Sequence, residues 1–188
     1  MAARKKAPAR KKAGAAKAKS PAKRAATRKV KPIPDGAHTV IGNLVLSDCT
    51  KAIALYQKAL GAKVVMNMPS PDGGSVWHAE LRIGNSIVFC NDAMPGMGPT
   101  APSPERPSPV SFWIWSKDCD ADFKRAVDAG FSMRGPPQDM FWGDRCAAVT
   151  DPFGYSWSFS THVKDMTEAE MRQGGADFAK AFAKEKQG

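Results

Sequence analysis

Acidic residues are absent from the first 31 positions of this 188-residue chain, which hold 13 Lys/Arg. The other 15 Lys/Arg face all 18 Asp/Glu, so the rest of the chain carries a net charge of −3, although the whole chain carries +10. The basic character therefore belongs to an N-terminal tail, and any argument for nucleic-acid binding applies to that tail alone. The tail also lacks large apolar residues between Met1 and Val30, so we expect residues 1–36 to be disordered.

Paired cysteine motifs are also missing. The four cysteines form no CxxC pair and have no zinc-finger spacing to a histidine, so we expect free thiols in a reducing compartment. No apolar run reaches the ~18–20 residues that a membrane span needs. The N-terminus has no apolar segment after its charges, which argues against a secretory signal. These absences predict a cytoplasmic protein without membrane contact, with association with the nucleoid as a further option.

Beyond the tail, the pattern of apolar residues predicts a strand, a helix and three further strands. Asp48 is the expected N-cap of the helix, and Gly61 is expected to end it. Turn residues separate the later strands. The predicted ranges are 39–47, 63–68, 76–83 and 86–91 for the strands and 49–60 for the helix.

A second unit repeats this order after a loop rich in Pro, Gly and Met. A shift of 70 residues places Asp48 on Asp118 and Gly84 on Gly154. The predicted strands are 110–116, 131–134, 145–150 and 155–160, and the predicted helix runs from the Asp118 cap to Ala129. The fold class is therefore α+β, with two βαβββ units at 37–91 and 110–163 in one domain, 37–163.

The C-terminal residues 164–188 are expected to form a helical extension. Thr167 and Glu170 have the spacing of a capping box and predict the start of a short helix. Gly174-Gly175 is expected to break that helix, and residues 176–186 are expected to form a separate, polar, partly frayed helix.

Several short sequence motifs resemble those of the vicinal oxygen chelate superfamily, which includes glyoxalase I, bleomycin- and fosfomycin-resistance proteins and extradiol dioxygenases. The motifs are Ala52-Ile53 through Tyr56-x-x-Ala59-Leu60-Gly61-Ala62, His78 to Gly84, Phe141-Trp142-Gly143-Asp144-Arg145, Asp151 to Ser158 and Thr161-His162-Val163. They are similar to those of the PhnB-like branch. The resemblance covers residues 38–163 and implies strands curved into a cup, a small-molecule ligand and a homodimer.

The metal enzymes of that superfamily take His and Glu ligands from the first, fourth, fifth and eighth strands. In this chain, counting along the strands and applying the 70-residue shift places Ile41, Val88, Ser111 and Ser158 at those positions. Hydrocarbon side chains offer no lone pair, and neutral serine hydroxyls are poor ligands for divalent transition metals. We therefore expect no metal and no other cofactor at the family site, although a divalent metal held elsewhere remains an alternative.

Aromatic and neutral polar residues are predicted to line the cup instead. The rings offer flat faces to a ligand and the hydroxyls offer hydrogen bonds. Arg145 is expected either to pair with a ligand carboxylate or phosphate or to form an internal salt bridge to Asp144, Asp151 or Glu80. Glu80, with His78 beside it, is the candidate for proton transfer, and a structural pair is the alternative. The predicted ligand-binding residues are Asn43, Ser111, Trp113, Trp115, Trp142, Arg145, Ser156 and Ser158.

The tail resembles the Lys/Ala/Pro tails of linker histones and bacterial histone-like proteins. Such a tail is expected to bind DNA or RNA nonspecifically through phosphates, with a solubilising leader as the alternative. Three functions follow: a metal-independent small-molecule-binding protein, an enzyme of the superfamily (lyase, isomerase or dioxygenase), and a nucleoid-associated protein that acts through its tail. The tail cations are Arg4, Lys5, Lys6, Arg10, Lys11, Lys12, Lys17, Lys19, Lys23, Arg24, Arg28, Lys29 and Lys31.

Overall fold

The computed structural model describes residues 30–34 and 36–185. Contacts divide the chain into residues 1–35 and residues 36–188, and every helix and strand of the described residues belongs to the second part. Residues 1–29 of the predicted tail, with all of its cations except Lys31, lie outside the described residues. None of the helices in the described ranges is long and apolar enough to span a membrane.

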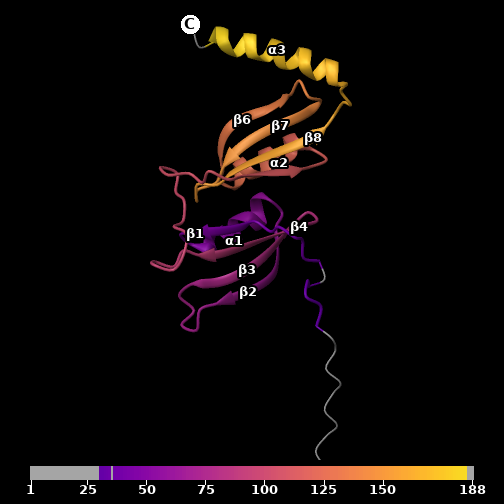
Figure 1. The fold of residues 1–188 in the computed structure, drawn as a ribbon. Helices are drawn as coiled ribbons and strands as arrows, with labels where there is room; N and C mark the ends of the chain where they lie inside the picture. Colours follow the sequence, from indigo (N-terminus) through magenta and orange to yellow (C-terminus); the bar gives the residue numbers. More distant parts are fainter. Residues whose placement is uncertain (1–29, 35, 186–188) are drawn as a thin grey trace, which may run out of the picture. The chain divides into compact units, whose positions relative to one another are not determined.

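Two βαβββ units follow one another in the chain, and a helix follows the second (Figure 1). The first unit contains β1 (Asn43–Leu46), α1 (Cys49–Ala59), β2 (Lys63–Pro69), β3 (Val76–Ile83) and β4 (Ser86–Asp92). The second contains β5 (Ser111–Trp115), α2 (Cys119–Ala129), β6 (Ser132–Asp139), β7 (Asp144–Thr150) and β8 (Ser156–His162). The last helix is α3 (Glu168–Glu185).

Each unit forms a four-stranded mixed sheet, and the two sheets have the same topology. The strand orders are β1-β4-β3-β2 and β5-β8-β7-β6. The first strand of each unit pairs in parallel with the last, and the other neighbours are antiparallel. The α+β class with two βαβββ units is therefore confirmed.

The helix starts follow from local chemistry. The side chain of Asp48 accepts a hydrogen bond from the backbone N–H of Lys51 at 2.9 Å, and that of Asp118 accepts one from Ala121 at the same distance. Both carboxylates satisfy a backbone donor that has no partner within the helix. Gly130 ends α2 in the left-handed conformation, at φ 114°.

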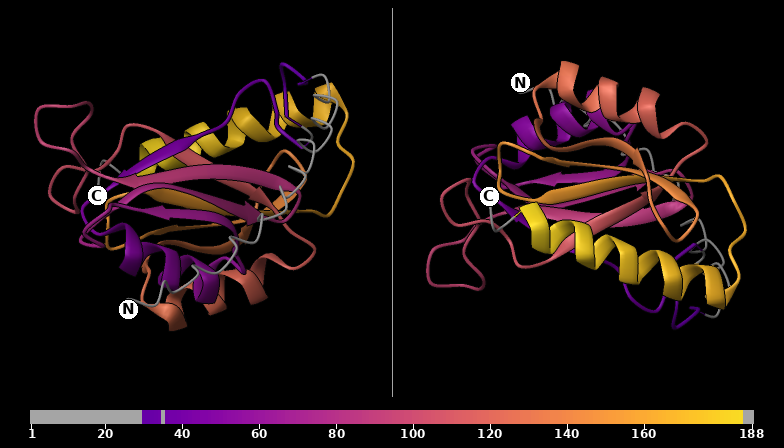
Figure 2. Two further views of the ribbon diagram at one scale, coloured as in Figure 1. Left: turned by 90° about the horizontal axis from the view of Figure 1, so that it is seen from below. Right: turned by 90° about the horizontal axis from the view of Figure 1, so that it is seen from above.

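The helices α1 and α2 lie on one side of the strands and α3 lies on the other (Figure 2). The hydrophobic core fills the side of α1 and α2, where Leu44, Tyr56, Trp157 and Phe159 are at most 1% exposed. We call the sheet face that points away from α1 and α2 the cup face. Side chains alternate between these two faces along each strand.

One buried carboxylate joins the two units. Asp151, in the β7–β8 loop, is 2% exposed and accepts hydrogen bonds from the Tyr56 hydroxyl at 2.8 Å and the Trp157 indole N–H at 2.9 Å. It also accepts the backbone N–H groups of Phe153 and Tyr155, each at 2.9 Å. Burial raises the pKa of this carboxyl, and the hydrogen bonds from its four donors oppose that rise. The Asp151 carboxylate thus connects the α1 helix of the first unit to the last hairpin of the second.

Two strands differ in length from their predicted ranges. β1 begins at Asn43, although the apolar run begins at residue 39. β6 continues to Asp139 through Pro136 and Pro137, where the sequence predicts an end at residue 134. β6 is the edge strand of its sheet, and a register shift between Gly135 and Gln138 takes both prolines out of regular pairing with β7, so their missing N–H groups are not needed.

The predicted break at Gly174-Gly175 is wrong, because α3 is one continuous helix through both glycines. The capping box is present at its start, where Thr167 Oγ1 accepts the Glu170 N–H at 3.2 Å and the Glu170 carboxylate accepts the Thr167 N–H at 2.8 Å. The glycines let the helix approach Phe141 closely: a Cβ on Gly174 would lie 2.7 Å from the Phe141 Cβ. Contact with Phe141 therefore explains why glycine stands inside this helix.

Candidate functional site

A cavity of about 210 Å³ lies on the cup face of the second sheet. Trp113 of β5, Ser158 of β8 and Trp142 of the β6–β7 hairpin line it, together with Met140 and Gln138. Three of the predicted ligand-binding residues, Trp113, Trp142 and Ser158, are therefore brought together around one space. Its walls combine two indole rings with a hydroxyl and an amide.

Strand alternation explains why these side chains face the cavity. Phe112 turns toward the core, where its ring stacks on Trp157 at a centroid distance of 4.6 Å. Trp113 is the next residue and therefore points to the opposite face, where it is 50% exposed. Ser158 is the register partner of Trp113 on β8, so the two side chains are neighbours on the cup face.

The other predicted ligand-binding residues are spread more widely. Trp115 is 63% exposed and lines a second cavity of about 280 Å³ with Trp113 and residues of the β3–β4 turn. Asn43 lines a third cavity of about 630 Å³, which is bordered by the proline-rich segment 99–110. Ser111 is exposed and is the register partner of Ser156, but neither lines these three cavities.

Arg134 is a candidate site residue that the sequence did not single out. Its guanidinium donates a hydrogen bond to the Ser156 hydroxyl at 2.9 Å, from the residue of β6 that precedes the cavity-lining Gly135. No ion pair of Arg134 is found among the described residues. A register shift between Met133 and Gly135 interrupts the alternation, so the pattern gave no signal of its direction.

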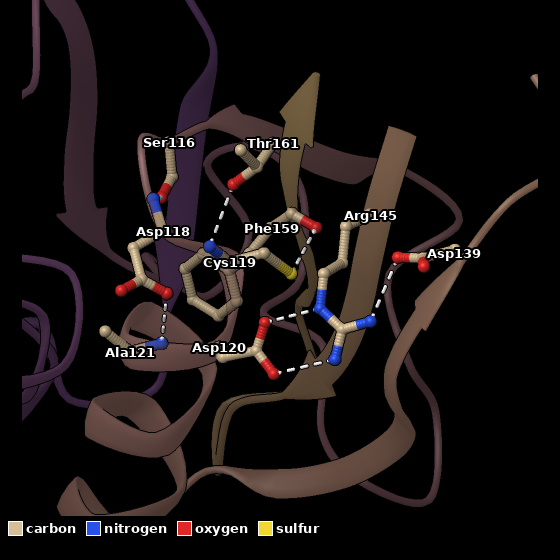
Figure 3. Close-up of polar contacts among 9 residues, drawn as sticks. All are labelled: Ser116, Asp118, Cys119, Asp120, Ala121, Asp139, Arg145, Phe159 and Thr161. Carbon is tan, nitrogen blue, oxygen red and sulfur yellow. Dashed lines mark hydrogen bonds and ion pairs between the residues drawn. The ribbon is translucent and has the colours of Figure 1, made fainter. Parts of the chain in front are cut away.

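Arg145 does not join this group. Its guanidinium binds the Asp120 carboxylate of α2 through two hydrogen bonds, at 2.5 and 2.8 Å, and Asp139 at 3.0 Å (Figure 3). These two carboxylates raise the pKa of Arg145 further above its usual range. The expected internal salt bridge is therefore present, with partners other than Asp144, Asp151 or Glu80. Arg145 ties β7 to α2 and to the end of β6.

The His78 and Glu80 side chains lie side by side on β3. The His78 Nε2 atom is 3.5 Å from Glu80 Oε1, and each side chain is a little over a quarter exposed. The His78 ring also packs edge-on against Phe89, with centroids 4.8 Å apart. Neither residue lines the three cavities described above. The pair has the geometry of a long hydrogen bond between two partly buried side chains beside an aromatic ring.

The four family ligand positions hold no metal-binding side chains in this chain. Three of them remain Ile41, Ser111 and Ser158, but the fourth is Phe89 rather than Val88. Val88 pairs with Leu81 and packs in the core, whereas Phe89 pairs with Asn43 and Glu80. Two hydrocarbon groups and two neutral hydroxyls do not suit a divalent metal. In residues 30–34 and 36–185, no group of three or more His, Cys, Asp or Glu side chains is placed to hold one.

All four cysteines are buried free thiols. Cys146 borders the cup-face cavity, and its Sγ lies 3.2 Å from the Ser160 Oγ. Burial, the largest effect, raises the pKa of the Cys146 thiol, which favours the neutral and less nucleophilic form. The cysteine at the cavity therefore acts as an apolar wall.

His162 and its two aspartate partners hold the segment that leads into α3 in place. The two ring nitrogens of His162 lie 2.8 Å from Asp144 Oδ1 and 3.0 Å from Asp165 Oδ1. Hydrogen bonds to the two carboxylates, that to Asp144 foremost, raise the pKa of His162. Next to it, the backbone N–H groups of Val163 and Lys164 donate to the Gly143 carbonyl at 3.0 and 2.9 Å. These contacts hold the start of the C-terminal extension against the hairpin that carries Trp142.

Comparison with known proteins identifies the family. Residues 37–159 match the model of the Glyoxalase/Bleomycin resistance protein/Dioxygenase superfamily, and the chain belongs to this superfamily. It is similar to Rv0887c of Mycobacterium tuberculosis, with 36% identity over 133 residues, which is 69% of this chain and 78% of Rv0887c.

Solved structures show the same fold. TioX of Micromonospora sp. ML1 has a TM-score of 0.55 and 24% identity, over 68% of this chain and all of TioX. The Bacillus cereus structure described as a PhnB protein and putative 3-demethylubiquinone-9 3-methyltransferase has a TM-score of 0.52 and 13% identity, over 66% of this chain and 99% of that one. A PhnB protein is thus among the structural neighbours, and the resemblance found in the sequence is confirmed at the level of the superfamily and its fold. Because the fold hosts many chemistries, the function has to be argued from the site.

Proposed function

We propose that this protein binds a small aromatic or amphipathic molecule in the cup-face cavity of its second sheet, without a metal. The observation that carries the proposal is the convergence of Trp113, Trp142 and Ser158 on one space. Two indole faces favour a flat apolar group, and the hydroxyl can orient it by a hydrogen bond. The residues at the metal positions support binding that depends on neither Lewis-acid chemistry nor a metal bridge.

Arg134 would give the ligand a preferred charge. An arginine whose observed partner is a neutral hydroxyl can still pair with a carboxylate, sulfonate or phosphate. The favoured ligand is therefore an aromatic molecule with one anionic group, its ring between the tryptophans and its charge near Ser156.

The test uses the fluorescent probe 1-anilinonaphthalene-8-sulfonate (ANS), which has this chemistry. Titration should quench tryptophan fluorescence and saturate, with the same affinity in the presence of EDTA. Trp142→Ala should weaken binding about tenfold, since an aromatic wall contributes ~1–2 kcal/mol. Trp77→Ala is the matched control, because Trp77 is 46% exposed and lines none of the three cavities. Unchanged affinity of Trp142→Ala, or loss of binding with EDTA, would contradict the proposal.

A second activity is favoured by the composition of the tail. Thirteen cations in 31 residues, with no acid among them, support nonspecific binding of DNA or RNA through phosphate contacts. The tail would then keep the ligand-binding domain near nucleic acid. The folded part has the opposite net charge and would not contribute.

The enzyme alternative depends on the His78–Glu80 pair or on a metal bound elsewhere. Elemental analysis of the purified full chain tests the second part: near-stoichiometric Zn, Ni, Mn or Fe would favour the enzyme. A homodimer, as expected of the family, is tested by light scattering.

A further inference from the structure

The strands β1 and β5 each lie at one edge of a sheet. Each has one neighbouring strand, so half of its backbone N–H and C=O groups point to a free edge. In β1, the carbonyl groups of Gly42 and Leu46 accept hydrogen bonds from N–H groups of residues 89 and 93, at 2.9 and 2.8 Å. Successive residues of a strand direct their backbone groups to opposite edges, so the groups of Val45 face the free edge.

Tyr155 closes the free edge of β1. Its hydroxyl oxygen accepts the Val45 N–H at 2.9 Å, and the hydroxyl donates to the Val45 carbonyl at 3.0 Å. Tyr155 is 6% exposed and Val45 is 7% exposed, so this contact is buried. Buried backbone groups need such partners, and both outward groups of Val45 are satisfied within the protein.

Trp115 holds the same position on β5. The Ser116 N–H donates to the Ser160 carbonyl of β8 at 2.8 Å, so the backbone groups of the preceding residue face the free edge. The 70-residue shift relates Val45 to Trp115 in the same way. In the described part of the chain, no hydrogen bond from outside β5 and β8 reaches the N–H or the C=O of Trp115. The edge of β5 is therefore open where the edge of β1 is closed.

A serine stands at the position of the closing tyrosine. Tyr155 lies three residues before Ser158, and Ser86 lies three residues before Phe89, which is the position of β4 that corresponds to Ser158. Serine lacks the ring that carries the Tyr155 hydroxyl to β1. The Ser86 hydroxyl donates to Asn85 Oδ1 at 3.3 Å instead. The difference between the two edges thus follows from one side chain.

A cavity of about 280 Å³ lies at the open edge of β5. Trp115 and Ser86 line it, together with Trp113, whose ring also lines the cup-face cavity. The two indole rings have centroids 6.4 Å apart, and Trp115 is 63% exposed. The volume is just below the ~300 Å³ at which pockets for drug-sized ligands begin. It therefore suits a group the size of one amino-acid residue better than a long protein segment.

We propose that the cavity beside β5 binds the amide group of a small peptide-like molecule. The N–H and C=O of Trp115 pair with the C=O and N–H of one ligand residue, as when a strand is added to a sheet edge. The indole rings of Trp113 and Trp115 favour an apolar or aromatic side chain on that residue. This site goes beyond the cup-face function, because it recognises a neutral amide rather than an anion.

The test uses two probes that differ in one hydrogen-bond donor. N-Acetyl-L-phenylalanine methylamide carries the required N–H, and in its ester analogue an oxygen replaces the phenylalanine N–H. NMR titration of the full chain should show binding of the amide with a Kd of about 1 mM and a downfield shift of the Trp115 N–H signal. The ester should bind about five- to tenfold more weakly, because it loses one hydrogen bond and places an acceptor opposite the Trp115 carbonyl.

Ser86→Tyr should close the edge of β5 as Tyr155 closes the edge of β1. Its binding of the amide should weaken at least about tenfold, whereas the matched control Ser86→Ala should bind within about twofold of the wild type. Ser86 does not line the cup-face cavity, so both variants should bind ANS normally. Trp142→Ala should show the reverse pattern, with weaker ANS binding and normal amide binding. Circular dichroism confirms that each variant is folded.

The outcomes separate this site from the cup-face function. Equal affinity of the wild type for the amide and the ester would overturn the proposal, and this comparison needs no variant. Unchanged amide binding by a folded Ser86→Tyr protein would also overturn it. If the amide instead dissociates a dimer of the wild type, the β5 edge is a surface for a second copy and the proposal is disproved. The cup-face function is decided separately, by the binding of ANS to Trp142→Ala.

Discussion

Asp151 shows how a single side chain holds the two units together. Its two carboxylate oxygens each accept two hydrogen bonds, from donors in α1, in its own loop and in β8. Such a group is stabilising only while all of its donors are satisfied, because an unpaired buried donor costs ~1–3 kcal/mol. The Asp-Pro-Phe-Gly segment is therefore a structural connection on the core side, away from the cup-face cavity.

Asp151→Asn should destabilise the fold by about 3 kcal/mol. The amide nitrogen cannot accept a hydrogen bond, so one orientation of the new side chain leaves the backbone N–H groups of Phe153 and Tyr155 unpaired. The other leaves the Trp157 N–H unpaired and makes the Tyr56 hydroxyl accept instead of donate. Urea denaturation measures the loss. Asp128→Asn is the control, since its exposed ion pair with Lys124 should contribute less than about 1 kcal/mol. Equal stability of the two variants would show that the network is not stabilising.

His162 gives the stability a pH dependence of known sign. Its folded-state pKa is raised above 6.5 by Asp144 and Asp165, so its charged form stabilises the folded state. The stabilisation is fully present below about pH 6.5 and is lost as the pH rises through the raised pKa. The melting temperature of the wild type should therefore exceed that of His162→Gln at pH 6, by a small margin because the side chain is half exposed. The difference should shrink by pH 9, and a difference that grows with pH would refute this role.

At the scale of elements, the position of α3 depends on a close fit between the helix backbone and Phe141. Phe141 fills the space that Gly174 and Gly175 leave open. Alanine at an ordinary helix position is more stable than glycine by ~0.5–1 kcal/mol. The two glycines should differ in this respect, because only one of them lies too close to Phe141 for a Cβ.

Gly174→Ala should release α3 from the hairpin, whereas Gly175→Ala should be tolerated. A Cβ on Gly174 would lie 2.7 Å from the Phe141 Cβ, but one on Gly175 would lie 3.4 Å from the nearest ring atom, in ordinary contact. Amide hydrogen exchange across residues 168–185 should be faster than wild type in the first variant and equal or slower in the second. Faster exchange in both variants would show that helix propensity or general strain, and not this contact, decides the result.

Local sequence patterns predicted most helices and strands. The remaining differences, in the extent of α3 and β6, depend on contacts between residues far apart in the chain. The caps at Asp48 and Asp118 and the stop at Gly130 depend on neighbouring residues, so the sequence placed them correctly. The glycines inside α3 contact Phe141, some 33 residues before Gly174 in the chain, and propensity alone predicted a break there. β6 is longer than predicted because its edge position and the register shift between Gly135 and Gln138 together tolerate the two prolines.

The candidate site was predicted only in part, for similar reasons. Trp113 and Ser158 follow from simple alternation along β5 and β8. The 70-residue shift selected Val88 instead of Phe89 because the connection before β3, residues 70–75, is longer than the connection before β7, residues 140–143. The longer β7–β8 loop offsets only part of that difference. The Arg145 side chain binds α2, and Arg134 lies within a register shift of β6. No local sequence pattern predicts the direction of either side chain.

At the scale of the whole molecule, charge is divided between two parts of the chain. Residues 1–31 carry all of the excess positive charge, and the remainder carries a net charge of −3. Phosphate binding by such a tail depends on counterion release and weakens steeply with salt. Ligand binding on the cup face should be independent of it.

Removal of residues 1–31 should abolish retention on heparin or DNA at low salt. The truncated protein keeps every helix and strand that the structure describes, so its affinity for ANS should equal that of the full chain. The full chain should elute at a salt concentration that does not depend on DNA sequence. Equal retention of the truncated protein would assign polyanion binding to the folded part and contradict the division of charge.

The most direct measurement is a crystal structure of the EDTA-treated protein with ANS bound. The account predicts the naphthalene ring between Trp113 and Trp142, with the sulfonate near Arg134 and Ser156. A probe seated in either of the other cavities, or an ion held on the cup face by three or more side chains, would contradict it.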